Sequence, residues 1–208
     1  MLALISATLA KLAQEIALLQ RTEIGELEEG YAPGRGGSST MPQKRNPITC
    51  EAIIGASRVV RQMVPAMLDA MLHDNERATG PWHVEWLSLP ETAILTHGIV
   101  VQTGRLLDGL VVRPERMGAN LKLTRGLISS EAVMMALAPA LGRQRAHDVV
   151  YDASMRAIER GTLLVDELLA EPEVTTHLER AAIERILDPS SYVGLAGQFV
   201  DRVLGRAG

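Results

Sequence analysis

Apolar residues recur at alternating spacings of three and four over the first 20 positions. The series is Leu2, Ile5, Leu9, Leu12, Ile16 and Leu19. Such spacing places the apolar side chains on one face of a long helix, as in helical bundles. A bundle helix is usually entered through a capping residue, and none precedes this one. The pattern therefore favours a truncated chain that starts inside a helix.

A second apolar series predicts another long helix after a polar loop. Asn46 suits its N-cap and Pro47 its first helical position. Pro65 is expected to kink the helix. The methionine spacing is typical of core packing, because methionine fills irregular gaps. The predicted core side is Ile53, Val60, Met63, Met67 and Met71.

The remaining chain predicts shorter helices and a change of organisation near residue 115. A polar bend over 73–90 precedes a third helix over 91–110, and Pro114 opens a short one. The later helices are expected at 128–141, 144–160, 162–170, 177–187 and 195–204. Aromatic residues make up only 3% of the chain, while strong helix formers abound. We expect an all-α fold with two domains, 1–115 and 116–208.

Composition excludes several classes of function. The net charge of −4 argues against nucleic acid as a partner. The single cysteine, Cys50, excludes an internal disulfide framework and a cysteine-based zinc cluster. Neither an HExxH nor an EF-hand spacing occurs, so we expect no metal and no cofactor. The apolar stretch Leu2 to Leu19 is interrupted by polar residues and lacks the features of a signal peptide. We therefore expect a cytoplasmic protein without membrane contact.

The loop at 34–47 is the one segment with clear chemical potential. Its three glycines allow close approach of the backbone to a ligand, and Ser38, Ser39 and Thr40 offer hydroxyl groups. Lys44 and Arg45 place positive charge beside the first turn of the next helix, whose free N–H groups attract anions. This favours a small polycarboxylate as ligand. The alternative is a solvated surface loop with a helix cap.

The order of residues in this loop resembles a known signature. Residues 37–47, GSSTMPQKRNP, are similar to the GSSxMPxKxNP motif of the fumarase/aspartase superfamily. The resemblance implies a long-helix bundle followed by a small C-terminal helical domain. It also implies that Ser38 is the catalytic base. The substrate-binding residues that it implies are Ser39, Thr40, Met41, Lys44 and Asn46.

A second stretch, residues 73–86, narrows the resemblance. It is similar to a segment of adenylosuccinate lyases, but Trp82 and Trp86 stand where those enzymes bind a phosphate with Ser and Arg. Together with 110–117 and 142–148, it resembles the bacterial 3-carboxy-cis,cis-muconate cycloisomerases more closely. That resemblance implies lactonisation of 3-carboxy-cis,cis-muconate to 4-carboxymuconolactone in protocatechuate degradation. It further implies a homotetramer in which each active site combines three conserved segments, each from a different subunit. Two of these three segments are absent from this chain.

Plainer roles remain open for the residues of this stretch. Trp82 and Trp86 are four residues apart and could simply pack together on a helix. His83 could be a surface or interface histidine, and Glu76 and Arg77 could form an ion pair. Two rival functions also remain: adenylosuccinate lyase or another lyase of the superfamily, and a catalytically incomplete helical assembly module.

Overall fold

The computed structural model describes residues 1–31, 41 and 43–206. Within these residues the chain is almost wholly helical, with two strands of two residues each, so the all-α prediction is confirmed. The chain divides into two compact units, Met1–Met117 and Gly118–Gly208. Each has its own apolar core.

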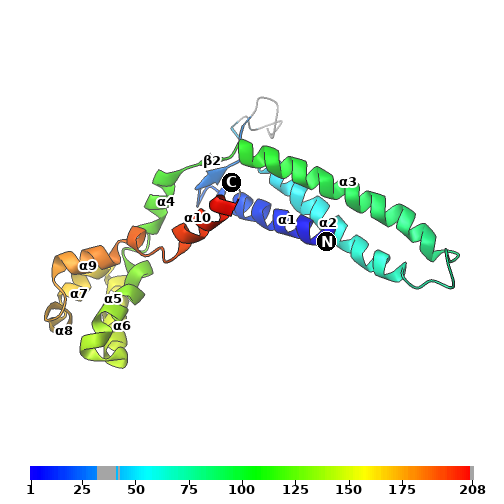
Figure 1. Ribbon diagram of the computed structural model, residues 1–208. Helices are drawn as coiled ribbons and strands as arrows, with labels where there is room; N and C mark the ends of the chain where they lie inside the picture. Colours follow the sequence, from blue (N-terminus) through cyan, green and yellow to red (C-terminus); the bar gives the residue numbers. More distant parts are fainter. Residues whose placement is uncertain (32–40, 42, 207–208) are drawn as a thin grey trace. The chain divides into compact units, whose positions relative to one another are not determined.

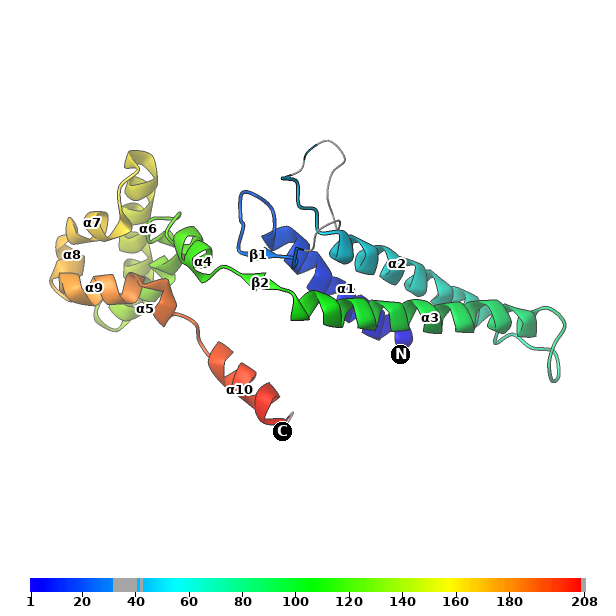
Figure 2. The ribbon, with the colours of Figure 1, turned by 90° about the horizontal axis from the view of Figure 1, so that it is seen from above.

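Three long helices build the first unit. Helices α1 (Leu2–Leu19), α2 (Ile48–Asp69) and α3 (Pro81–Asp108) lie side by side, with α2 and α3 forming a hairpin (Figures 1 and 2). Pro65 lies inside the continuous helix α2. The core is small and consists of Ala13, Ile16, Cys50, Ile53, Val60, Ile99 and Leu106.

Helix α3 begins ten residues earlier than the sequence predicted. The polar bend ends at Gly80, whose φ of 98° suits glycine, and Pro81 is the first helical residue. Pro90 was taken as the end of the bend but lies inside the helix. Proline fixes φ at a helical value, so it fits the first turn well, and packing against α2 sustains the helix past Pro90.

The buried face of α1 also differs from the prediction. The face that packs against α2 and α3 is made mainly of small residues, including the fully buried Ser6 and Ala13. In the predicted apolar series, Ile16 is buried, whereas Ile5 and Leu12 are 39% and 36% exposed. Small side chains allow the helices to approach closely, which leaves the larger ones outside. At the end of α2, Met71 is 72% exposed and is not part of the core.

Helix α1 is, by length and apolar composition alone, able to cross a membrane. The polar residues that interrupt Leu2–Leu19 therefore do not by themselves exclude such a span. A core helix of a water-soluble protein passes the same test, so this property alone is weak evidence. Only 17% of the apolar window is buried within this chain.

Two short strands close the end of the first unit where α2 begins. β1 (Leu27–Glu28) pairs antiparallel with β2 (Val111–Val112), and Leu27 faces Val112 across the pair. Beside this pair the backbone of Gly30 lies against Gly109. A Cβ atom at Gly30 would be 2.5 Å from the Gly109 carbonyl oxygen. Neither strand is predicted by the pattern of the sequence.

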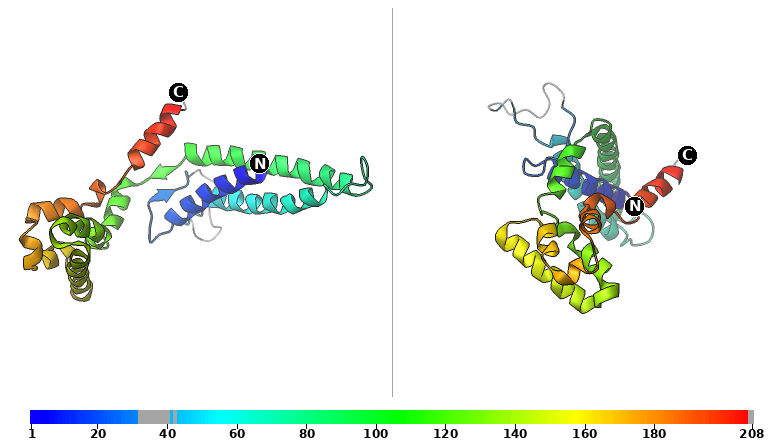
Figure 3. Two further views of the ribbon diagram at one scale, coloured as in Figure 1. Left: turned by 60° about the horizontal axis from the view of Figure 1, so that its bottom comes forward. Right: turned by 90° about the vertical axis from the view of Figure 1, so that its left-hand side faces the viewer.

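The second unit is a cluster of shorter helices (Figure 3). Helix α4 (Pro114–Leu121) spans the boundary between the units. A 3₁₀ turn at Leu127–Ser129 leads into α5 (Ser130–Leu141), and α6 (Arg143–Arg160) packs against α5. The chain continues through α7 (Leu164–Leu169), α8 (Pro172–Thr175), α9 (Arg180–Leu187), a 3₁₀ turn (Pro189–Ser191) and α10 (Ala196–Arg206). Its fully buried side chains include Val133, Leu137, Leu164, Leu168, Val174 and Ile183.

Candidate active-site segment

The candidate site residues fall partly inside the described segment. Ser38, Ser39 and Thr40 lie outside the described residues. Met41 is 45% exposed, and its carbonyl oxygen accepts a hydrogen bond from the Lys44 N–H at 3.0 Å. Lys44 and Asn46 lie just before α2, at the end of the bundle that carries β1 and β2.

The start of α2 differs from the predicted cap in two ways. The helix begins at Ile48, and Pro47 rather than Asn46 holds the cap position, without a side-chain cap. The free N–H groups of its first turn are already occupied by a carboxylate of the chain. Glu29 accepts hydrogen bonds from the backbone N–H groups of Thr49, at 3.2 Å, and Cys50, at 2.7 Å. These two donors of the predicted anion site are therefore used by Glu29.

The Arg45 side chain contacts residues that precede the loop in the chain. Its guanidinium pairs with the Glu28 carboxylate at 2.5 Å and lies 4.7 Å from the centre of the Tyr31 ring. Arg113, which follows β2, pairs with the other oxygen of Glu28. The hydrogen bond to Glu28 raises the pKa of the Arg45 guanidinium further above its already high value. Arg45 is thus a charged group with partners inside the protein.

Lys44 and Asn46 line a cavity of about 660 Å³ in the first unit. Its described lining is rich in charge, with four basic side chains against two acidic ones. The charged residues are Arg21, Lys44, Arg45, Arg113, Glu28 and Glu51. A smaller cavity of about 170 Å³ is also lined by Asn46, together with Tyr31, Gln102 and the start of α2. A cavity with excess positive charge and amide groups suits a small polyanion.

Cys50 takes no part in this chemistry. It is fully buried in the core of the first unit. Burial raises the pKa of the Cys50 thiol, and the neighbouring Glu29 raises it further. A thiol that stays protonated is neither a nucleophile nor a metal ligand.

The stretch at 73–86, which narrows the family resemblance, lies far from Lys44 and Asn46. Trp82, His83 and Trp86 lie at the start of α3, beside the end of α2 (Figure 1). Helix α2 has 22 residues and separates the two places by about 33 Å. Within one chain, Lys44 and Asn46 therefore lie too far from the tryptophans to share an active site with them.

The structure supports the plainer reading of these aromatic residues. The Trp82 and Trp86 rings contact each other edge to face, with 4.8 Å between their centroids. The centroid of the His83 ring lies 4.7 Å from that of Trp86. In the described bend, Glu76 and Arg77 do not form the ion pair that the sequence left open. Arg77 has a φ of 56°, so its backbone turns sharply. His73 lies 3.8 Å from Glu85 instead.

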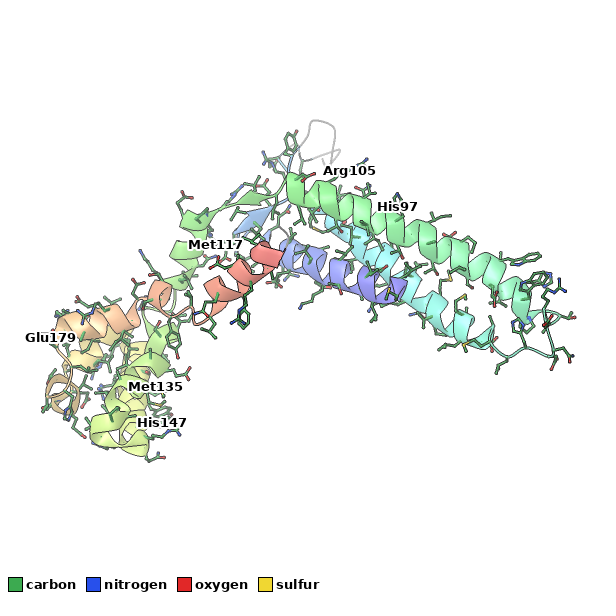
Figure 4. The ribbon with its side chains drawn as sticks, in the orientation of Figure 1. His97, Arg105, Met117, Met135, His147 and Glu179 are labelled. Atoms are coloured by element: carbon green, nitrogen blue, oxygen red, sulfur yellow. The ribbon has the colours of Figure 1, made fainter. Side chains whose placement is uncertain are left out.

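The other histidines do not assemble a site. His97 is exposed on α3, and His147 lies on α6 (Figure 4). The His147 ring stacks against that of Tyr151. Among the described residues, His, Cys, Asp and Glu side chains form no group of three that could hold a metal ion.

Two known protein families match two separate parts of the chain. Residues 1–61 match the Lyase family, and residues 126–203 match the Adenylosuccinate lyase C-terminus family. The first match contains the loop and the start of α2. The second covers most of the second unit.

Relatives with different activities match almost the whole chain. Trans-aconitate decarboxylase 1 of Mycosarcoma maydis is 46% identical over 99% of the chain. Nitrosuccinate lyase of Streptomyces davaonensis is 44% identical over 98%, and 3-carboxy-cis,cis-muconate cycloisomerase of Acinetobacter baylyi is 40% identical over 99%. The chain spans only 42%, 43% and 46% of their respective lengths.

A solved structure agrees with these matches. The 3-carboxy-cis,cis-muconate lactonizing enzyme from Pseudomonas putida superposes with a TM-score of 0.88 at 37% identity. The match covers 98% of this chain and 44% of that one. The chain thus has the helical fold of the fumarase/aspartase superfamily, as the loop signature predicted.

Proposed function

We propose that this chain, which has the fold of the fumarase/aspartase superfamily, is the C-terminal part of an enzyme of that superfamily that acts on a small polycarboxylate. The specific activity proposed is that of a 3-carboxy-cis,cis-muconate cycloisomerase. The observation that carries the proposal is the position of Lys44 and Asn46. Both lie near the end of the signature at 37–47 and line a cavity with excess positive charge. Relatives of this name, 37–41% identical over nearly the whole chain, support it.

The proposed reaction needs charge stabilisation and one proton transfer. A carboxylate oxygen of the diene attacks an alkene carbon, and a C–O bond forms. The alkene electrons move toward the neighbouring carboxylate, giving an aci-carboxylate whose carbon then takes up a proton. In reverse, Ser38 removes that proton as its alkoxide. Lys44 and Asn46 hold the substrate carboxylates and stabilise the extra negative charge.

A second candidate is another activity within the same superfamily. The trans-aconitate decarboxylase and the nitrosuccinate lyase are slightly more similar to this chain than the named cycloisomerases are. Their names also point to substrates with several carboxylates, which the same cavity would suit. Adenylosuccinate lyase is less favoured, because Trp86 stands where that enzyme has an arginine for the phosphate.

The proposed enzyme would need further subunits or segments to complete its site. Lys44 lies about 33 Å from the Trp82 region, the length of α2. We propose a homotetramer in which the loop of one subunit meets segments of others. A helical assembly module without activity is the alternative for the 208 residues alone.

The test uses the longer protein that contains this chain. Ser38→Ala should lower kcat by ~10³-fold or more, because a proton-transfer group is lost. Lys44→Ala should raise KM and lower kcat, since substrate and intermediate are both polyanions. Ser57→Ala, inside α2 and away from the cavity, is the matched control and should leave kcat unchanged. Near-normal turnover by Ser38→Ala would remove the assignment of the base.

A panel of substrates decides between the candidate activities. 3-Carboxy-cis,cis-muconate, trans-aconitate, nitrosuccinate and adenylosuccinate are each supplied to the wild-type enzyme. We expect the highest kcat/KM for 3-carboxy-cis,cis-muconate. A higher value for another of the four would assign that activity instead.

A further inference from the structure

Arg45 lies between the two residues that are proposed to bind substrate. Lys44 and Asn46 flank it in the chain, so three polar side chains follow one another at the entrance to α2. Two positive charges in a row suggest that both bind the anionic substrate. The contacts of Arg45 argue otherwise.

The Arg45 side chain is engaged by a nearly buried carboxylate. Glu28 has only 10% of its side chain exposed, and its two oxygens pair with Arg45 and Arg113. A carboxylate taken out of water is costly unless it is paired, and removing Arg45 would leave Glu28 with one of these two ion pairs. The Tyr31 ring, 4.7 Å from the guanidinium carbon, adds a cation–π contact.

The Arg45 backbone is held as well. The Gln20 side chain, at the end of α1, donates a hydrogen bond to the Arg45 carbonyl oxygen at 3.4 Å. The same side chain accepts one from the Glu29 N–H at 2.9 Å. Glu29 in turn holds the N–H groups of Thr49 and Cys50. Consecutive glutamates thus hold both ends of segment 45–50.

We propose that Arg45 is a positioning residue that binds no substrate, and that with Glu28 it fixes the backbone from which Lys44 and Asn46 reach the cavity. This inference rests on the proposed function for the roles of Lys44 and Asn46. Site groups must be held to within a fraction of an ångström to act, and their supporting residues commonly do this. Glu28 should therefore matter as much as Arg45, although a carboxylate has no reason to bind an anionic substrate.

The experiment compares Glu28→Gln and Arg45→Gln with wild type in the 208-residue chain. Amide hydrogen exchange over residues 43–52 reports how firmly the backbone of this segment is held. We expect both substitutions to speed exchange there by about tenfold, and the double variant to add little more. Arg145→Gln, which removes a similar arginine–glutamate pair between α6 and α8, is the matched control and should leave this segment unchanged.

A titration with propane-1,2,3-tricarboxylate adds a binding arm. The expected result is that Glu28→Gln and Arg45→Gln weaken binding equally, while Arg45→Lys, which keeps the charge, also weakens it. If Arg45→Gln abolishes binding while Glu28→Gln changes neither binding nor exchange, Arg45 binds the anion directly and the inference is wrong.

The two arms separate this inference from the proposed function. If wild type binds no tricarboxylate, the proposed site is incomplete or wrong in this chain, and the exchange arm still decides the role of Arg45. Unchanged exchange in both variants would overturn that role, whatever the binding result.

Discussion

Glu167 is nearly buried in the second unit, where three side chains hold its carboxylate. The Thr162 hydroxyl donates to it at 2.8 Å, and the Arg156 and Arg160 guanidiniums each lie 3.2 Å away. The Thr162 hydrogen bond and the two arginines lower the pKa of Glu167, outweighing the opposite effect of burial. A buried carboxylate paired in this way stabilises the fold only while it is ionised.

This pairing predicts how the second unit responds to acid. Because the pKa of Glu167 is lower in the folded state, its contribution is complete above the unfolded value of about 4.3. It is lost progressively as pH falls from there through the folded pKa. We expect Glu167→Gln to lower the melting temperature at pH 7 and to flatten its decline in acid. Glu179→Gln, on the exposed surface (Figure 4), is the control and should follow wild type. Parallel melting curves for Glu167→Gln and wild type would contradict the assignment.

Candidate site residues can be proposed from the sequence more readily than the residues that contact them. Lys44 and Asn46 could be located from the order of residues, because the loop signature is local. Glu28 and Glu29 could not be identified in this way. Their partners, Arg45 and the start of α2, lie 17 to 21 residues away in sequence and meet them only through tertiary structure. The only local sign of their role is that the two glutamates are adjacent, Glu28 in β1 and Glu29 directly after it, and this pair has no periodicity.

Helices were predictable as elements, but not always the faces that they bury. The spacing of apolar residues identified α1, yet both its large and its small apolar residues repeat at helical intervals. Which face packs inside depends on how closely α2 and α3 approach, and that distance cannot be read from one helix. The strands β1 and β2 were missed because two residues carry no pattern.

The closure at β1 and β2 yields a prediction about Gly30. In Gly30→Ala the new Cβ would be 2.5 Å from the Gly109 carbonyl oxygen, so the backbone must shift. We expect this change to destabilise the first unit by about 1–3 kcal/mol, measured by urea unfolding. In the control, Gly55→Ala, nothing lies within 4 Å of the added atom in α2. That change should stabilise the helix by up to about 1 kcal/mol. Equal midpoints for the two variants would show that the close contact is absent.

The division of the chain into two units leads to a further prediction. We propose that residues 1–115 and 116–208 are separate domains. Leu137 is fully buried in the core of the second unit, and Leu137→Ala should cost about 2–5 kcal/mol there. Hydrogen exchange should then rise across α5, α6 and α9 but not across α2. The reciprocal variant, Ile53→Ala, should raise exchange in the first unit alone. Equal loss of protection in both units from either variant would indicate one cooperative domain.

The first unit leaves much of its apolar surface uncovered, which predicts self-association. On α1, Leu4 is 74% exposed, and on α3, Leu87 is 77% exposed. Apolar patches of this extent are rare on soluble monomers. A lipid bilayer could cover α1, but Lys11 and Glu15 lie within this helix, and a charged residue at a bilayer centre costs about 2.5–3.5 kcal/mol. Further copies of the chain are therefore the favoured cover, and closed symmetry is the usual result.

Sedimentation equilibrium at micromolar concentration tests this assembly. We expect an oligomer, with four copies as in the proposed enzyme, and a shift toward monomer in Leu4→Gln combined with Leu12→Gln. Both changes lie on the exposed face of α1, so the helix itself should persist. Leu123→Gln, which is equally apolar and 73% exposed in the second unit, is the control and should leave the association unchanged. A well-folded wild-type monomer would contradict a shared bundle. The chain could instead bind lipid vesicles, and the α1 variant could lose that binding. This result would assign the exposed face of α1 to a membrane, because apolar surface that is buried between copies of the chain is not available to lipid.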